Sequence, residues 1–299
     1  MAVGRRAVVI VAGPKVKRRS PLRLAWDFRT GTLGLVIVLF VAFIAFFGPQ
    51  VAPHDPYAQN IAQRLKPPFW DPAGSVENLL GTDQLGRDEL SRLIYAARWS
   101  CLVGVLAAAV ATVIGVPLGL IAGYYGRYVD AIVTFFVNVV MAFPFIVFAL
   151  AIIAFLGPSF TNMIITLGVA GWVGYARVVR SEVLSLRERD YVIASRSVGA
   201  RGSYVLRKHM LPGVLDSVLV LASLQVAAMI LAEAFLSFIG FGIQPPTPSW
   251  GSMLADSRVY MLTRWWLATF PGLAIFITAL GVNLLGDGLR DAFDPRTRR

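Results

Sequence analysis

Six apolar runs, each long enough to cross a membrane as a helix, dominate this chain of 299 residues. A helix needs roughly 20 apolar residues to cross a bilayer. The first run covers residues 32–47 and reaches that length with its flanks over 31–52. The other runs lie at about residues 99–123, 130–156, 162–179, 214–241 and 265–289. The pattern predicts an all-α membrane protein with six transmembrane helices.

The composition agrees with a membrane protein. Hydrophobic residues make up 57% of the chain and charged residues only 15%, whereas about a quarter of the residues in soluble domains are charged. In a soluble protein the net charge of +11 would suggest nucleic-acid binding. In a membrane protein it reflects Lys and Arg that hold loops in the cytoplasm. We therefore expect a lipid bilayer, and no nucleic acid, as a partner.

The distribution of basic residues predicts the orientation of the chain. With six spans both termini lie on one side, and the segments on that side hold 21 of the 28 Lys and Arg residues. The segments on the other side hold seven. Because cytoplasmic loops are enriched in Lys and Arg, we expect both termini to be cytoplasmic.

This orientation divides the chain into five parts. Residues 1–30 form a basic cytoplasmic tail, and residues 31–52 form the first transmembrane helix. Residues 53–98 form an external excursion, whose prolines and aromatic residues indicate order rather than a flexible linker. Residues 99–290 form a five-helix core that includes a cytoplasmic loop over residues 180–212. Residues 291–299 form a second cytoplasmic tail.

A polar, basic stretch interrupts the apolar sequence at residues 190–212. We expect a short helix over 191–198, a break at the small residues of 199–202, and a second short helical piece. Pro212 should end this piece, because proline lacks an N–H and restricts the residue before it.

The predicted helix at residues 191–198 has two different faces. Tyr191, Ala194 and Val198 share one face. The other face is almost without side chains, and its residues are Ser195, Gly199 and Gly202. A bare face allows another backbone to come close, so the stretch is either a docking element or only a solvated connection.

Sequence motifs of enzymes are missing from the chain. No phosphate-binding loop of the GxxxxGK[ST] kind occurs, so we do not expect this chain to bind ATP in that way. The two histidines, His54 and His209, fall on opposite sides of the membrane, which excludes a zincin-type site and leaves a histidine-based triad unsupported. We expect neither a catalytic nor a metal site. Cys101 lies in an apolar run and is predicted to be a small core residue.

Glu233 is the one acid deep in a predicted span. A carboxylate there is costly unless it is neutral, paired or facing a wet path. Three readings are open: Glu233 faces a polar cavity, bonds a neighbouring helix or relays protons. Candidate residues for a polar path are Glu233, Ser237 and Asn138.

The segment GIQPPTPSW at residues 242–250 follows the fifth span on the external side. Its prolines form a stiff extended piece, and Trp250 is typical of an interfacial anchor. The segment is either a turn or a rigid rim at the external mouth, with Pro245, Pro246 and Trp250 as the candidate rim residues.

Six longer motifs follow one another along the chain. They are LGTDQLGRDELSR (80–92), GVPLGLIAGYYG (115–126), SLRERDYVIASRSVGA (185–200), HMLPG (209–213), ILAEAFLSFIGFGIQPPTPSWG (230–251) and NLLGDGLRDAFDP (283–295). Together they resemble the C-type permease subunits of dipeptide, oligopeptide and nickel ABC importers over about residues 30–295. The loop at residues 190–212 resembles the conserved cytoplasmic EAA motif of ABC importer permeases.

The resemblance implies a type I ABC importer permease fold in a bacterial or archaeal plasma membrane. It implies a second, homologous permease as heterodimer partner and two cytoplasmic ATPase subunits or domains that bind ATP and Mg. An extracytoplasmic substrate-binding protein would deliver the cargo. Di- and oligopeptides are the favoured cargo, and nickel or another small solute is the alternative. This chain would itself have no catalytic activity and no cofactor.

Carried onto this chain, the EAA-type helix becomes a coupling helix that lies in a groove of an ATPase. The residues implied in coupling are Asp190, Tyr191, Ala194, Ser195, Arg196, Gly199, Ala200, His209, Leu211 and Pro212. Ile193 stands where the family usually has the first Glu of the motif. Without that Glu a salt bridge to the ATPase is lost, so we expect a more apolar contact that depends on shape. Ser195 and Gly213 also depart, from the usual Ala and Asn.

Two other classes of function remain open. A proton-driven secondary carrier would use Glu233, would transport as a purified chain alone, and would lose its pH dependence in Glu233→Gln. An intramembrane enzyme would need polar catalytic pairs inside the spans, and the sequence offers one lone acid there. The arginines of the cytoplasmic loop also favour contact with lipid headgroups.

Overall fold

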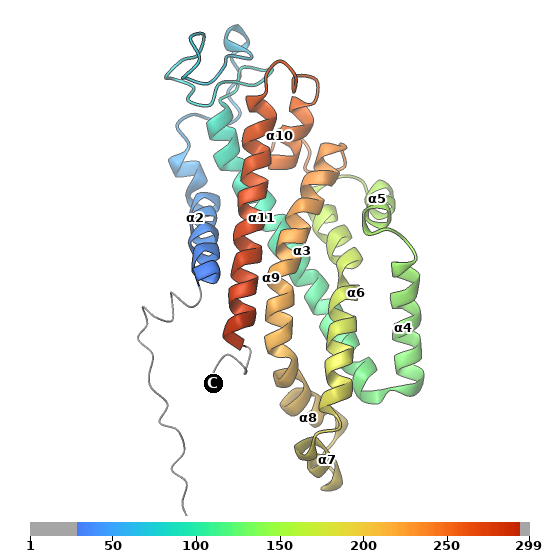
Figure 1. The fold of residues 1–299 in the computed structure, drawn as a ribbon. Helices are drawn as coiled ribbons and strands as arrows, with labels where there is room; N and C mark the ends of the chain where they lie inside the picture. Colours follow the sequence, from blue (N-terminus) through green and yellow to red (C-terminus); the bar gives the residue numbers. More distant parts are fainter. Residues whose placement is uncertain (1–28, 294–299) are drawn as a thin grey trace, which may run out of the picture.

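The computed structural model describes residues 29–293, which form an elongated bundle of helices (Figure 1). The described part contains no β-strand. In chain order the helices are α2 (Arg29–Val51), η1 (Ile61–Gln63), α3 (Glu89–Tyr125), α4 (Arg127–Met141), α5 (Phe145–Leu156), α6 (Phe160–Leu186), α7 (Asp190–Ser197), α8 (Gly202–Val205), the π-helical turn η2 (Leu206–Met210), α9 (Leu211–Phe238), α10 (Trp250–Ser257) and α11 (Trp266–Phe293).

Five described helices are long and apolar enough to cross a membrane, or six if the bent pair α4–α5 counts as one span. This result confirms the predicted all-α membrane architecture. The predicted span at residues 130–156 is not a single straight helix, because α4 and α5 meet at a bend of 90°. Pro144, the N-cap of α5, lies at the bend and cannot continue the hydrogen-bond pattern of α4.

Helix α3 begins before the apolar run that predicts it. Its first residue is Glu89, and the Asp88 carboxylate caps it by accepting the N–H of Ser91 at 2.8 Å. The excursion after α2 therefore ends at residue 88 rather than at the predicted residue 98. Hydropathy misplaces this boundary because the first turn of α3 contains the charged side chains of Glu89 and Arg92, which are nevertheless buried.

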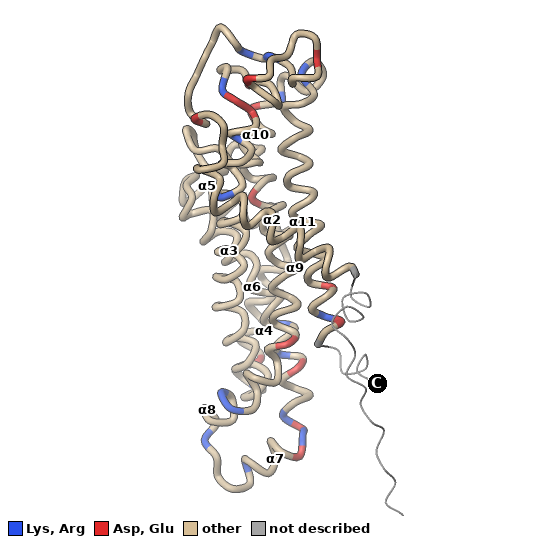
Figure 2. Tube along the Cα trace, turned by 90° about the vertical axis from the view of Figure 1, so that its left-hand side faces the viewer, with Lys and Arg blue, Asp and Glu red and all other residues tan. Residues whose placement is uncertain are grey.

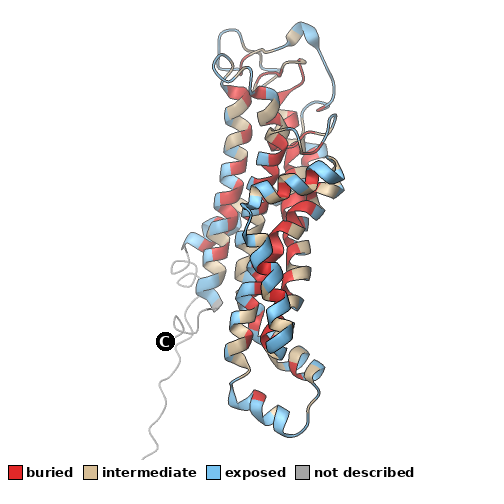
Figure 3. Ribbon diagram, turned by 90° about the vertical axis from the view of Figure 1, so that its right-hand side faces the viewer, coloured by how far each residue is buried: buried red, intermediate tan, exposed pale blue. Residues whose placement is uncertain are grey.

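The core lies between α3, α6 and α9, where the buried residues concentrate, whereas α4, α5 and α7 are largely exposed (Figure 3). Glycines bring α3 and α6 together. A Cβ on Gly115 would lie 2.4 Å from the Trp172 carbonyl oxygen, and one on Gly119 would lie 2.7 Å from that of Ala176. Gly123 fits against Val183 in the same way. Small residues at helical spacing thus allow the close approach of two helices that is common in membrane proteins.

The sequence pattern predicts that Pro212 ends a short helical piece, and this prediction is wrong. Residues Gly202–Phe238 run as one long helical segment, in which η2 leads into α9. Pro212 is the second residue of α9 and follows directly on the π-helical turn η2, so the irregular turn lies where the proline interrupts the helical hydrogen-bond pattern. The predicted loop is therefore rigidly continuous with a transmembrane helix.

Both ends of the described chain lie toward the end of the bundle that holds α7 and α8, and the excursion over residues 52–88 lies at the opposite end (Figure 1). Charged residues gather at both of these ends (Figure 2). The arrangement agrees with a chain whose termini lie on one side of the membrane.

Candidate functional site

The loop around α7 projects from the bundle and turns sharply after the helix. The N–H of Gly199 donates to the Arg196 carbonyl at 3.0 Å, and the N–H of Ala200 donates to the Ser195 carbonyl at 3.2 Å. These two bonds form a Schellman motif, which needs a left-handed residue just past the helix. Gly199 supplies it with a φ of 80°. The predicted break at this glycine is confirmed.

Three apolar side chains fasten the loop to the bundle. Val192 of α7, Val205 of α8 and Met210 of η2 are fully buried in one cluster with residues of α3, α6 and α9. Burying each of them contributes on the order of 1.5–3 kcal/mol. The loop is therefore a fixed shape at the end of α6 and α9.

His209 links α7 to the helical segment that follows it. Its ring centroid lies 5.7 Å from that of Tyr191 and 5.9 Å from that of Tyr204. Leu211 is half-buried beside it, and Pro212 is exposed. These residues shape and support the loop from behind α7.

The outward side of the loop encloses an open hollow of about 750 Å³. Its lining includes Ser195, Gly199, Ala200, Arg201, Tyr204, Arg207 and Lys208. Val198 stands at the hollow with 85% of its side chain exposed, and a Cβ on Gly199 would meet nothing within 4 Å. The surface combines exposed apolar and basic groups, which suits contact with another protein.

The other predicted coupling residues divide between the outer surface and the bundle. Asp190, Ala194 and Arg196 are exposed on α7, and Ile193 is half exposed beside them. Gly202 does not belong to the bare outer face, contrary to the prediction. A Cβ there would lie 3.1 Å from the hydroxyl of Tyr125 at the end of α3. Gly202 therefore serves contact within the chain.

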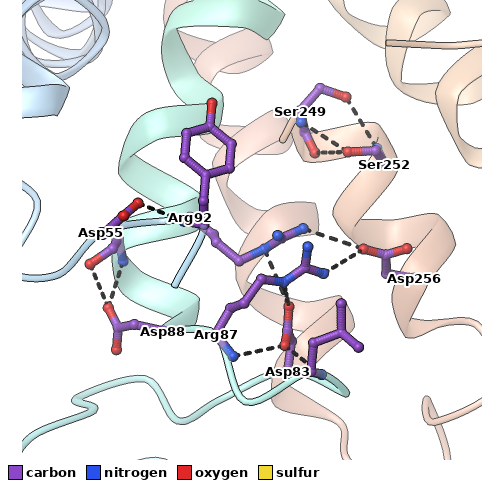
Figure 4. A network of polar contacts seen from close by, with 11 residues as sticks. Asp55, Asp83, Arg87, Asp88, Arg92, Ser249, Ser252 and Asp256 are labelled. Atoms are coloured by element: carbon purple, nitrogen blue, oxygen red, sulfur yellow. Dashed lines mark hydrogen bonds and ion pairs between the residues drawn. The ribbon is translucent and has the colours of Figure 1, made fainter. Parts of the chain in front are cut away.

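The opposite end of the bundle holds a buried ion cluster (Figure 4). Asp83 Oδ2 lies 2.6 Å from Arg87 Nε and 3.4 Å from Arg92 Nε. Both guanidinium groups also reach Asp256 Oδ2 of α10, at 3.5 and 3.3 Å. The cluster ties the excursion, α3 and α10 together. The sequence shows Asp83, Arg87 and Arg92 only as parts of a motif and gives no sign of the distant partner Asp256.

Trp250 is a core anchor, not the interfacial anchor that its position predicts. It is 3% exposed, its N–H donates to Ser100 Oγ at 3.1 Å, and its indole Nε1 donates to the Leu93 carbonyl at 3.1 Å. Ser249 caps α10 with a reciprocal capping box and so fixes the tryptophan against α3. Of the predicted rim residues, only Pro245 and Pro246 are exposed.

Glu233 and Ser237 lie inside the chain. Glu233 is fully buried and Ser237 is 4% exposed. The Ser237 hydroxyl donates to Glu233 Oε1 at 2.6 Å, and the Ser249 hydroxyl lies 3.5 Å from that of Ser237. Their burial indicates a packing role where α9 meets the start of α10. Their assignment to a translocation path stays a prediction.

Asn138, the third candidate for a path, is exposed on α4. Its carbonyl accepts the N–H of Ala142 at the end of the helix. Asn138 thus lies on a different helix from Glu233 and Ser237, and its assignment to a common path with them stays a prediction.

Comparison with known proteins places the chain in a family of transporters. The family model described as binding-protein-dependent transport system inner membrane component matches residues 115–299. A second model, the N-terminal TM domain of oligopeptide transport permease C, matches residues 20–68.

Curated relatives match along almost the whole chain. The di/tripeptide transport system permease protein DppC of Pseudomonas aeruginosa is 40% identical over 289 residues, which cover 95% of each chain. The dipeptide transport system permease protein DppC of Escherichia coli is 44% identical over 284 residues, which cover 94% of this chain and 95% of the relative.

Two solved structures share the fold. A chain of the inward-facing MetNI methionine ABC transporter aligns with a TM-score of 0.54 at 21% identity, over 67% of this chain and 95% of its own length. A chain of an amino acid ABC transporter aligns with a TM-score of 0.52 at 15% identity, over 68% and 94%. The predicted ABC importer permease fold is thereby confirmed, and the protein belongs to the family of binding-protein-dependent transport system inner membrane components, the permeases of ABC importers.

Proposed function

We propose that this chain is one of two homologous permease subunits of a peptide ABC importer, and that the hollow at α7 receives a cytoplasmic ATPase subunit. The observation that carries the docking proposal is the rigid turn at Gly199, which presents an open hollow of about 750 Å³ without any side chain at its apex. A groove on a partner can come close to such a backbone.

The peptide cargo rests on the relatives. The di/tripeptide permease DppC of Pseudomonas aeruginosa is 40% identical to this chain, and the dipeptide permease DppC of Escherichia coli is 44% identical, in both cases over nearly the full length. An extracytoplasmic binding protein would deliver the peptide to the end of the bundle that holds the excursion. The chain itself would bind no cofactor and catalyse no reaction, and ATP and Mg²⁺ would bind in the two ATPase subunits.

Co-purification tests the proposal. The tagged chain, isolated from its native membrane in mild detergent, should retain a second permease and two ATPase domains. Proteoliposomes of that assembly should import a radiolabelled dipeptide only with ATP and the binding protein.

Peptide uptake by the purified chain alone, driven by a pH gradient without ATP, would instead support a secondary carrier. The structure gives this alternative no support. Glu233 is fully buried, and its Oε1 accepts a hydrogen bond from the Ser237 hydroxyl.

A further inference from the structure

Arg177 lies in a helix that is a candidate membrane span. Helix α6 continues for more than two turns beyond it, to Leu186, and Phe160–Leu186 is a candidate span. An arginine within a span is costly and commonly serves a substrate path. Its surroundings therefore bear on function.

Arg180, one turn further along α6, has a structural role within the chain. Arg180 pairs with Asp130 of α4 through two contacts, of which Nη2 to Oδ2 measures 2.7 Å. Arg177, by contrast, has no acidic partner in the described part of the chain. Its Nη1 lies 3.4 Å from Met141 Sδ, and a thioether is only a weak acceptor. The exposed Arg177 guanidinium can therefore bind another acceptor.

Met141 also lines a cavity at the bend between α4 and α5. The cavity measures about 340 Å³ and is bordered by Met141, Phe143, Phe145, Phe148, Gly174 and Gln225. A Cβ on Gly174 would meet nothing within 4 Å, so the cavity is open beside this glycine. Gly174 lies one helical turn before Arg177 on α6. Ligand sites of this size are mostly apolar with a few placed polar groups.

The bend suits a transport path because irregular backbone inside a membrane is tolerated where it faces protein or a cavity. Broken helices form the substrate sites of many transporters for this reason. Here the bend brings aromatic side chains of α4–α5 opposite the amide of Gln225 on α9.

We infer that Gln225, which lines the cavity beside the α4–α5 bend, and Arg177, which contacts Met141 at the edge of that cavity, form a subsite that binds the carboxylate-bearing end of the cargo. The inference rests on the proposed transport of peptides, whose free C-terminus is a carboxylate. The planar guanidinium of Arg177 binds a carboxylate through two parallel N–H bonds. The Gln225 amide then donates to a peptide carbonyl, and the aromatic rings contact the cargo's side chains.

The test measures uptake of one dipeptide as the free acid and as the C-terminal amide, using the complete transporter and its binding protein in proteoliposomes. For each peptide, uptake by Arg177→Gln is divided by wild-type uptake, which cancels the preference of the binding protein. The free-acid ratio should fall at least about tenfold, as expected for a lost charge-assisted bond. The amide ratio should change by less than about twofold, and Arg177→Lys should restore much of the free-acid uptake.

A matched control is Arg180→Gln, which removes only the pair with Asp130. It should lower both uptakes by the same factor. Equal ratios for both peptides in Arg177→Gln would overturn the subsite and point to pairing of Arg177 with the second permease or a lipid headgroup. Absence of any peptide uptake by the wild type would instead contradict the proposed function.

A second measurement does not depend on delivery of the amide. The test introduces Gly174→Cys in a Cys101→Ser background and labels the new thiol with two methanethiosulfonate reagents. The reagent that carries an anionic sulfonate group should react faster than the one that carries a cationic trimethylammonium group. Arg177→Gln should reduce that preference severalfold. The free-acid dipeptide, added at high concentration, should slow the reaction more than its amide does. An unchanged preference in Arg177→Gln would show that Arg177 does not act on this cavity.

Discussion

The two ends of the bundle are held together by different kinds of contact. At the excursion end, Asp83 and Asp256 bind the guanidinium groups of Arg87 and Arg92, and Trp250 is fixed by two hydrogen bonds to α3. At the α7 end, the loop is fastened by buried apolar side chains and leaves an open, basic and apolar hollow. At the first end the charged side chains pair with one another within the chain, whereas the second end presents an open hollow on which the proposed docking of an ATPase rests.

The difference shows where the chain depends on other subunits. Buried ions must be paired within the chain, because an unpaired one destabilises the fold by several kcal/mol. A hollow with an exposed glycine turn adds little to the stability of the isolated chain, which agrees with the proposal that it receives a partner. We therefore expect substitutions at the two ends to separate binding from stability.

The largest contrast should come from two glycines in the same motif. Gly240 follows α9 in the same Schellman motif in which Gly199 follows α7. The N–H of Gly240 donates to the Ser237 carbonyl at 3.0 Å, and the N–H of Phe241 donates to the Leu236 carbonyl at 2.9 Å. The φ of Gly240 is 96°. Neither glycine has an atom within 4 Å of a built Cβ. Gly199→Trp should abolish retention of the ATPase subunits during purification, whereas Gly240→Trp should leave it intact.

Both tryptophan variants should lose a similar amount of stability, about 1–2 kcal/mol for a left-handed residue with a side chain. Unfolding in detergent would verify this match. Equal loss of the ATPase subunits in both variants would break the contrast between the two ends.

At the excursion end, Asp83→Ala should lower the free energy of unfolding by about 3–5 kcal/mol, because it leaves two buried guanidinium groups short of a partner. Asp256→Ala should lower it by about 1 kcal/mol, since the Asp256 side chain is 41% exposed. Denaturant titration in micelles measures both. ATPase retention per folded molecule should not change, and a loss of retention in Asp83→Ala would show that the ends are coupled.

At the α7 end, Val192→Ala should cost about 2 kcal/mol locally, because Val192 is the fully buried residue of α7. The effect should appear as faster hydrogen exchange of residues 190–200, with little change around the excursion. Unchanged exchange would mean that the loop is held by something other than this side chain.

The smallest effect is expected for Ile193→Glu, which restores the acid usual in the family motif. Ile193 is 49% exposed on α7, so the variant should fold normally. If shape governs the contact, ATPase affinity should stay within about twofold, as measured by titration of detergent-solubilised subunits. A change of tenfold or more would show that charge at this position controls docking.

Hydropathy predicts the spans well, because bilayer thickness acts on the sequence directly. The sides of the membrane stay a prediction from the distribution of Lys and Arg. The turn at Gly199 is also predictable, since glycine is the usual residue after a helix in a Schellman motif. The pattern at residues 80–92, together with the other motifs, is sufficient to place the family.

Contacts between distant segments are not predictable in this way. Asp256 meets Arg87 across 169 residues, and nothing in either local sequence indicates it. Trp250 looks like an interfacial residue, but the capped start of α10 packs it against α3. Arg177 lies in the predicted span at residues 162–179, but nothing in the local sequence indicates its contact with Met141 at the α4–α5 bend.

The most direct test uses two valines, Val198 at α7 and Val259 after α10, each 85% exposed. Each is replaced by Cys in a Cys101→Ser background, and maleimide labelling is followed in detergent with the permease alone and with the ATPase subunits bound. Docking at the hollow predicts that the ATPase subunits slow labelling of Val198→Cys strongly and leave that of Val259→Cys unchanged. Equal labelling of Val198→Cys in the free permease and in the full assembly would contradict the account.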